Sequence, residues 1–100
     1  LQLSMLLKKL NRWQEASNLW HYMVEKQIYE DIALIELAKY YEHKVKDYIK
    51  AAEATEKAIS LLYKKRAMGC SYGYFQSELK KLKKRQERLN LKIKRQTNTV

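Results

Sequence analysis

The chain has 100 residues, enough for one small domain with a thin core. Hydrophobic residues make up 46% of it, and there are only two glycines and no proline, so collagen-like and disordered classes are excluded. No apolar run approaches the roughly 20 residues that span a bilayer. The chain begins with Leu and shows no signal-peptide pattern, from which we expect a fragment of a longer cytoplasmic protein. The single cysteine, Cys70, has no partner for an internal disulfide, which fits a reducing compartment.

Apolar residues recur at intervals of three and four along the chain, which predicts an all-α fold. The predicted helices span 1–10, 13–26, 30–43, 47–66 and 73–95. Asp47 is predicted to cap the fourth helix, because its side-chain oxygen can accept from a free backbone amide of the first turn. Gly69 and Gly73 bracket the clearest helix-breaking segment, and residues 96–100 are expected to form a disordered tail.

The last predicted helix carries a narrow apolar seam. Its members are Phe75, Leu79, Leu82, Leu89 and Ile93, with Gln86 as the one interruption. Most of the positions between them are Lys or Arg, so the helix is expected to cap a helical stack with one apolar edge inward and a cationic face outward. A coiled-coil strand is the alternative, but three heptads are few for one.

The formal charge of +10 is concentrated in this C-terminal third. Residues 1–63 hold nine basic and nine acidic side chains, whereas residues 64–100 hold twelve basic and two acidic ones, which account for the whole +10. Such a helix suggests an anionic partner, although a basic end can also serve only to keep a domain in solution. The predicted basic face comprises Lys80, Lys81, Lys84, Arg85, Arg88, Lys92 and Arg95. Charge reversal at Lys81, Lys84, Arg85 and Arg88 is expected to leave the fold intact.

The sequence contains an internal repeat. In two places a polar turn is followed by an aromatic residue, Trp13 or Tyr48, and three residues later by an alanine, Ala16 or Ala51. The two alanines are 35 residues apart, a spacing typical of arrays of helix pairs.

The second copy resembles the tetratricopeptide (TPR) consensus. The residues that carry the resemblance are Leu37, Ala38, Tyr40, Tyr41, Asp47, Tyr48, Ala51, Thr55 and Ala58. It implies antiparallel helix pairs in which Ala38, Ala51 and Ala58 lie where neighbouring backbones approach. The expected organisation is a degenerate repeat at about 1–28, a second repeat at about 30–66 and a capping helix at about 73–95.

A more specific resemblance covers residues 34–48 and 54–58. The phrase ELAKYYEHK, continued by KDY and TEKA, is similar to the C-terminal TPR region of bacterial proteins that carry an N-terminal ribonuclease H-like, exonuclease-type domain, the YprB-like family. The resemblance implies that catalytic carboxylates lie in the upstream domain and that no position here inherits a catalytic role.

The TPR resemblance also implies a concave groove lined by the first helix of each pair. The residues expected there are Met5, Lys8, Lys9, Ile32, Ile35, Lys39, Glu42 and His43. The lysines could meet carboxylates of a bound peptide while the apolar side chains supply contact area, although they could equally be solvated surface groups.

No constellation of catalytic, metal-binding or cofactor-binding residues emerges from the sequence. His21 and His43 are 22 residues apart without a second ligand at metal spacing. The acidic residues Glu36, Glu42, Glu53 and Glu56 lie among lysines at helical spacing and are interpreted as solvated ion pairs. We therefore expect no enzyme activity, no metal and no cofactor.

Three hypotheses about function follow. The first is a protein-interaction module that binds a protein segment or its own upstream domain. The second is a nucleic-acid-binding appendage that uses the basic helix, with Tyr63, Tyr72 and Tyr74 as candidates for base stacking. The third is a homodimer formed through the first or last helix, because the first helix has an apolar edge of Leu3, Leu6, Leu7 and Leu10.

Overall fold

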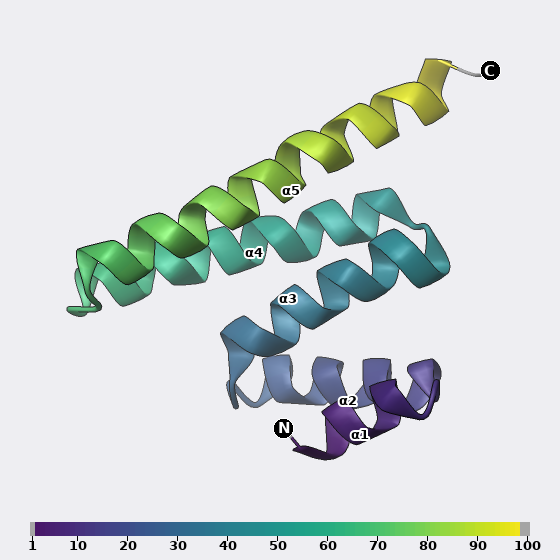
Figure 1. Ribbon diagram of the computed structural model, residues 1–100, viewed down its shortest axis with the longest axis horizontal. Helices are drawn as coiled ribbons and strands as arrows, with labels where there is room; N and C mark the ends of the chain where they lie inside the picture. The colour runs from purple at the N-terminus through teal and green to yellow at the C-terminus, as the bar shows by residue number, and fades with distance from the viewer. Residues whose placement is uncertain (1, 99–100) are drawn as a thin grey trace.

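The computed structural model describes residues 2–98, and every regular element within them is helical. The elements are α1 (Gln2–Lys9), α2 (Trp13–Glu25), α3 (Glu30–Tyr40), the π-helical turn η1 (Tyr41–Val45), α4 (Tyr48–Ala67) and α5 (Tyr72–Asn98). The predicted all-α class is confirmed. Figure 1 shows a stack with α1 and α2 at one end, α3 in the middle, and α4 and α5 at the other end.

Each helix packs mainly against its neighbours in the chain, so the molecule is an extended stack measuring 46 × 29 × 20 Å. Several alanines lie in the core between helices: Ala16, Ala38 and Ala51 are fully buried and Ala58 is nearly so. Larger side chains there would force the helices apart. The prediction that Ala38, Ala51 and Ala58 lie in tightly packed positions is therefore confirmed.

The connection between α3 and α4 includes the expected cap. The chain leaves η1 through Lys46, whose φ of 61° is left-handed, and the amide of Asp47 donates to the carbonyl of Tyr41 at 2.8 Å. Asp47 Oδ1 then accepts from the backbone amide of Lys50 at 3.1 Å, which satisfies one of the free donors of the first turn of α4. The predicted N-cap is confirmed.

The α4–α5 connection differs in detail from the prediction. Gly69 has φ = 110°, a conformation that favours glycine, and it ends α4. Gly73 instead lies inside α5, which starts after Ser71, whose Oγ accepts from the amide of Tyr74 at 3.2 Å. Gly69 alone therefore acts as the breaker.

The expected disordered tail at 96–100 is wrong for its first three residues. Helix α5 continues to Asn98, because this stretch lacks glycine and proline and nothing in its sequence terminates a helix. The Thr97 hydroxyl donates to the carbonyl of Ile93 at 3.0 Å within the last turns. The final two positions of the predicted tail lie outside the described residues.

Candidate functional site

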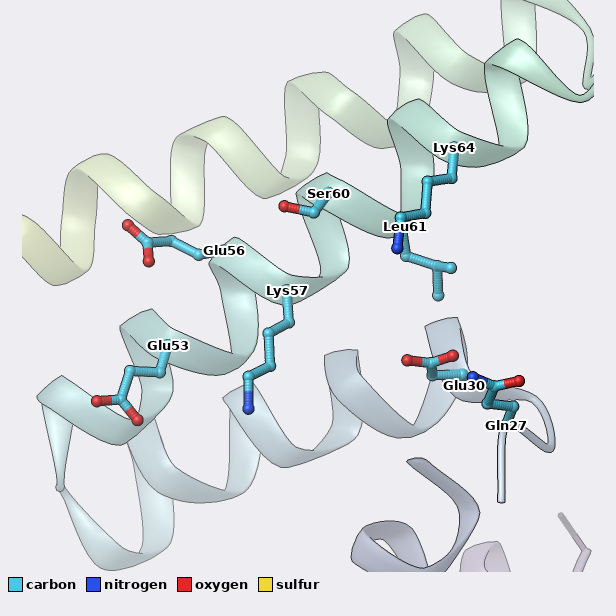
Figure 2. Close-up of a pocket in the computed structure, with 8 residues that line it drawn as sticks. All are labelled: Gln27, Glu30, Glu53, Glu56, Lys57, Ser60, Leu61 and Lys64. Carbon is cyan, nitrogen blue, oxygen red and sulfur yellow. The ribbon is translucent and has the colours of Figure 1, made fainter. Parts of the chain in front are cut away.

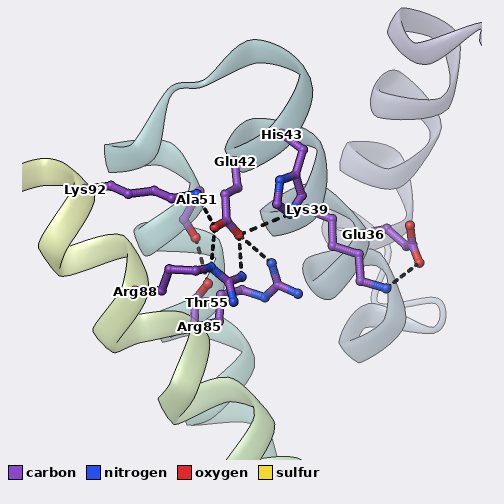
Figure 3. Close-up of polar contacts among 9 residues, drawn as sticks. All are labelled: Glu36, Lys39, Glu42, His43, Ala51, Thr55, Arg85, Arg88 and Lys92. Atoms are coloured by element: carbon purple, nitrogen blue, oxygen red, sulfur yellow. Dashed lines mark hydrogen bonds and ion pairs between the residues drawn. The ribbon is translucent and has the colours of Figure 1, made fainter.

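A buried carboxylate, Glu42, joins η1 to α5 (Figure 3). Its side chain is 0% exposed and receives three cationic side chains. Arg85 Nη1 lies 2.6 Å from Oε1, Arg88 binds both oxygens through Nε at 2.6 Å and Nη2 at 2.8 Å, and Lys92 Nζ lies 2.8 Å from Oε2. We call these four residues the Glu42 cluster.

The spacing of the three cations explains how α5 presents them together. Positions 85, 88 and 92 are three and four residues apart, so they lie on one side of a helix. Burial alone would raise the pKa of Glu42, but hydrogen bonds from Arg88 and Lys92, together with their charges, outweigh it and hold the pKa at about 2. Glu42 is therefore charged at neutral pH and attaches α5 to the end of α3.

The Glu42 cluster corrects two expectations. Glu42 is not exposed in a groove, and the interpretation of the acidic residues as solvated is wrong for Glu42 and for Glu36, which is 6% exposed. The predicted basic face also divides. Arg85, Arg88 and Lys92 turn inward to Glu42, whereas Lys80, Lys81, Lys84 and Arg95 are exposed.

The predicted groove residues are only partly brought together. A hollow of about 200 Å³ is lined by Lys8, Trp13, Glu36, Lys39, Tyr40, His43 and Lys44, and one of about 240 Å³ by Ile35, Lys39, Glu78, Lys81, Leu82 and Arg85. Lys39 borders both. Met5 and Ile32 are half-buried and Lys9 is exposed, and none of the three lines either hollow.

The lysines on this side of the molecule already have an acidic partner. Lys8 Nζ lies 2.8 Å from Glu36 Oε2, and Lys39 Nζ lies 3.6 Å from Glu36 Oε1. A ligand carboxylate would have to compete with Glu36 for them.

A larger groove runs along α4, facing the α2–α3 connection and the start of α3 in its wider part (Figure 2) and α2 in its second part, and the sequence did not predict it. Its wider part, about 560 Å³, is lined by Gln27, Glu30, Glu53, Glu56, Lys57, Ser60, Leu61 and Lys64. A second part of about 260 Å³ is lined by His21, Val24, Leu34, Leu37, Tyr41, Lys50, Glu53, Ala54 and Lys57. Glu53 and Lys57 border both parts, so they form one groove, which we call the α2–α4 groove.

One end of the α2–α4 groove carries a hydrogen-bonded pair. His21 Nε2 lies 2.8 Å from the hydroxyl of Tyr41. Partial burial lowers the pKa of His21, and the charges of Lys50 and Lys57 lower it further. Two lysines therefore make the potential at this end positive. The hydrogen bond links α2 to η1, while His21 remains exposed.

The apolar edge predicted on the first helix is present in part. Leu3, Leu6 and Leu10 are 58%, 51% and 56% exposed, whereas Leu7 points inward and is 8% exposed. Three leucines at the open end of the stack therefore remain uncovered.

The stacking candidates differ in availability. Tyr63 is 50% exposed and packs edge-on against Phe75 with centroids 5.2 Å apart, and Tyr72 and Tyr74 are 61% and 44% exposed. Tyr72 is held by its neighbours: Gln76 Nε2 donates to its hydroxyl at 2.6 Å, and the guanidinium of Arg66 lies 5.6 Å from its ring centre.

Within residues 2–98, no group of three or more His, Cys, Asp or Glu side chains is arranged to hold a metal ion. None of the described helices is long and apolar enough to cross a membrane.

Comparison with known proteins gives one informative similarity. Over 62 residues, 60% of this chain, the sequence is 45% identical to the uncharacterized protein YprB of Bacillus subtilis (strain 168). The match covers 15% of the length of YprB, so the chain corresponds to a small part of that protein. No family model and no solved structure matches.

Proposed function

We propose that this chain is a non-catalytic, TPR-type module that binds a protein segment, and that it serves as an accessory part of a longer, YprB-like cytoplasmic protein with a ribonuclease H-like domain. The observation that carries the proposal is the α2–α4 groove. Its wider part, about 560 Å³, falls in the size range of binding clefts, which is roughly 300–1,000 Å³.

The composition of the α2–α4 groove suits a peptide. Val24 and Leu61 are half-buried and offer apolar surface for side chains of a ligand, above the buried Leu34 and Leu37. Lysines at positions 50, 57 and 64 repeat every seven residues and so form a row along α4, interspersed with Glu53 and Glu56. A segment with apolar anchors and charges of both signs would complement this surface.

The wider context of the proposal rests on similarity and packing. Stacked helix pairs require antiparallel helices that pack in chain order through small residues. The helices of this chain pack in that order and bury several alanines, which supports the TPR-type interpretation. The similarity to a short part of YprB supports an accessory role. A second occupant consistent with the same proposal is the upstream domain of the longer protein.

A peptide-display selection on the folded chain tests the groove. We expect enriched peptides to bind the wild type and to bind a Ser60→Trp variant at least about tenfold more weakly, because the indole would fill the wider part of the groove without changing its charge. Ser77→Trp, an equally exposed serine-to-tryptophan change on α5, is the matched control and should bind as the wild type does.

Circular dichroism of all three proteins should be identical. Peptides that bind Ser60→Trp as tightly as the wild type would show that the α2–α4 groove is not the binding site. Equal loss in the two variants would point to a non-specific effect of the added tryptophan and would equally contradict the proposal.

A further inference from the structure

The cations of α5 that remain after internal pairing form a second surface, independent of the α2–α4 groove. Helix α5 carries nine basic and two acidic side chains, a net charge of +7, and Glu42 neutralises one of these charges, which leaves a net charge of about +6. Lys80, Lys83, Lys84 and Lys94 are all exposed and lie away from the apolar seam of Phe75, Leu82 and Leu89. We call these four residues the α5 lysine strip.

The α5 lysine strip is long and straight enough to follow a nucleic-acid backbone. Helix α5 has 27 residues, and the strip runs along it from Lys80 to Lys94, a length of about 21 Å at 1.5 Å per residue. One acidic residue, Glu87, lies between the lysines on this side, and Glu78 is engaged by Lys81 at 3.5 Å. Between Lys84 and Lys94 the same side of the helix carries Glu87 and Leu91. The strip therefore consists of three closely spaced lysines and a fourth further along, and these cations are available to contact phosphates.

An exposed aromatic ring extends the strip at its N-terminal end. Tyr72 precedes Gln76 by four residues and Lys80 by eight, a spacing that places the three on one side of the helix. Because Gln76 and Arg66 already hold the ring, stacking a base on it would cost little additional side-chain entropy. Cationic and aromatic side chains in one line are the combination that single strands need, since their bases are free to stack.

We propose that the surface formed by the α5 lysine strip and Tyr72 binds single-stranded nucleic acid, with the lysines contacting phosphates and Tyr72 stacking on one base. A duplex would offer the phosphates but not the open face of a base, so Tyr72 should discriminate between the two.

Fluorescence anisotropy with a labelled single-stranded oligonucleotide of mixed sequence is the test, at about 50 and about 200 mM salt. Four phosphate contacts to a single strand give a salt slope of about −2.8, so the affinity of the wild type should fall about 50-fold between these concentrations. Replacing all four lysines of the strip by Gln should weaken binding at least about tenfold at the lower salt concentration and flatten the slope.

The matched control replaces four exposed lysines outside both proposed surfaces, Lys9, Lys26, Lys44 and Lys46, by Gln. Both variants remove four charges from +10, which leaves +6, so net charge is equal and only position differs. The control should keep its affinity within about threefold. Tyr72→Ala should weaken single-strand binding about tenfold and leave duplex binding unchanged, whereas Tyr22→Ala, at a similarly exposed tyrosine, should change neither.

The proposal would be wrong if single strands do not bind at the lower salt concentration, or if the two lysine variants lose affinity equally. It would also be wrong if duplex binds as tightly as single strand and Tyr72→Ala changes neither affinity. Binding only to vesicles that contain phosphatidylserine would overturn it as well. Circular dichroism of each variant checks that a loss of affinity does not come from a loss of helical structure.

Discussion

Glu42 is a charged residue placed where water does not reach it. An isolated buried carboxylate costs several kcal/mol, and the cost is offset here because both oxygens are hydrogen-bonded by cations. The cations differ in burial: the side chains of Arg85, Lys92 and Arg88 are 17%, 28% and 45% exposed, so the desolvation cost is smallest for Arg88. The hydrogen bonds from these three cations to Glu42 therefore hold α5 in place.

Acid should weaken this attachment. The pKa of Glu42 is about 2 in the folded chain against an ordinary value of 4.5, so its stabilisation is complete above pH 4.5 and is lost as the pH falls from 4.5 toward 2. A shift of this size corresponds to about 3 kcal/mol. We expect Glu42→Gln to lower the free energy of unfolding by about that amount at neutral pH, measured by urea denaturation, and to reduce its dependence on pH over this range.

Two comparisons make the acid experiment specific. The pKa of Asp31 is also lowered, because burial, which alone would raise it, is outweighed by the hydrogen bond from Lys65. Asp31 therefore also adds to the pH dependence of stability, and it does so equally in the wild type and in Glu42→Gln. The difference between wild type and variant therefore isolates Glu42. Glu53→Gln, at an exposed position of α4, should match the wild type, and identical pH profiles for the wild type and Glu42→Gln would refute the role assigned to the cluster.

At the residue scale, the sequence predicted the alanines and the Asp47 cap correctly but not the ion pairs. The cap and the alanines are set by neighbours within one helix or one repeat, which periodicity reveals. Glu42 and Glu36 instead meet partners 28 to 50 residues away, and both also have basic neighbours close by in sequence. Local spacing therefore suggested solvated pairs, although the effective partners are tertiary.

At the element scale, the helix ranges were predicted closely because no proline and few glycines interrupt the period of three and four. The departures lie at helix ends. The predicted third helix changes to the π-helical turn at Tyr41–Val45, and α5 is longer than expected at both ends. Helix ends depend on capping contacts and on tertiary packing, which periodicity does not record.

The seam of α5 allows a matched test within one helix. Leu89 is 0% exposed and Leu91 is 55% exposed, although they are two residues apart. We expect Leu89→Ala to reduce the free energy of unfolding by about 3 kcal/mol because it leaves a cavity in a packed position, and Leu91→Ala to change it by less than about 0.5 kcal/mol. Urea denaturation followed by circular dichroism measures both, and similar losses would mean that α5 does not pack along this seam.

At the scale of the whole molecule, the sequence located the basic region but not the α2–α4 groove. The α2–α4 groove depends on α2 and α4 flanking α3, a property of how three helices are spaced rather than of any one of them. Of the residues predicted to line a groove, Lys8, Ile35, Lys39 and His43 border smaller hollows elsewhere. A one-dimensional pattern assigns residues to helix faces, but it does not give the width between helices.

The division of the basic face into paired and exposed cations leads to the last prediction. Lys80→Glu with Lys84→Glu, and Arg85→Glu with Arg88→Glu, each change the net charge by −4, from +10 to +6. The lysine pair is exposed, so its reversal should leave the thermal unfolding midpoint nearly unchanged, since exposed charges contribute little to stability. The arginine pair would bring two carboxylates against the buried charge of Glu42, and removing such partners typically costs about 3–5 kcal/mol.

Hydrogen exchange distinguishes these cases element by element. We expect the arginine reversal to raise exchange in α5 and η1 while α1 and α2, at the other end of the stack, keep their protection, because consecutive packing transmits little from one end to the other. Charge reversal at Arg85 and Arg88 is therefore not expected to leave the fold intact, contrary to the prediction from the sequence. Substitutions that test nucleic-acid binding should be confined to the exposed lysines. Equal protection of α5 in both variants would show that Glu42 does not hold this helix.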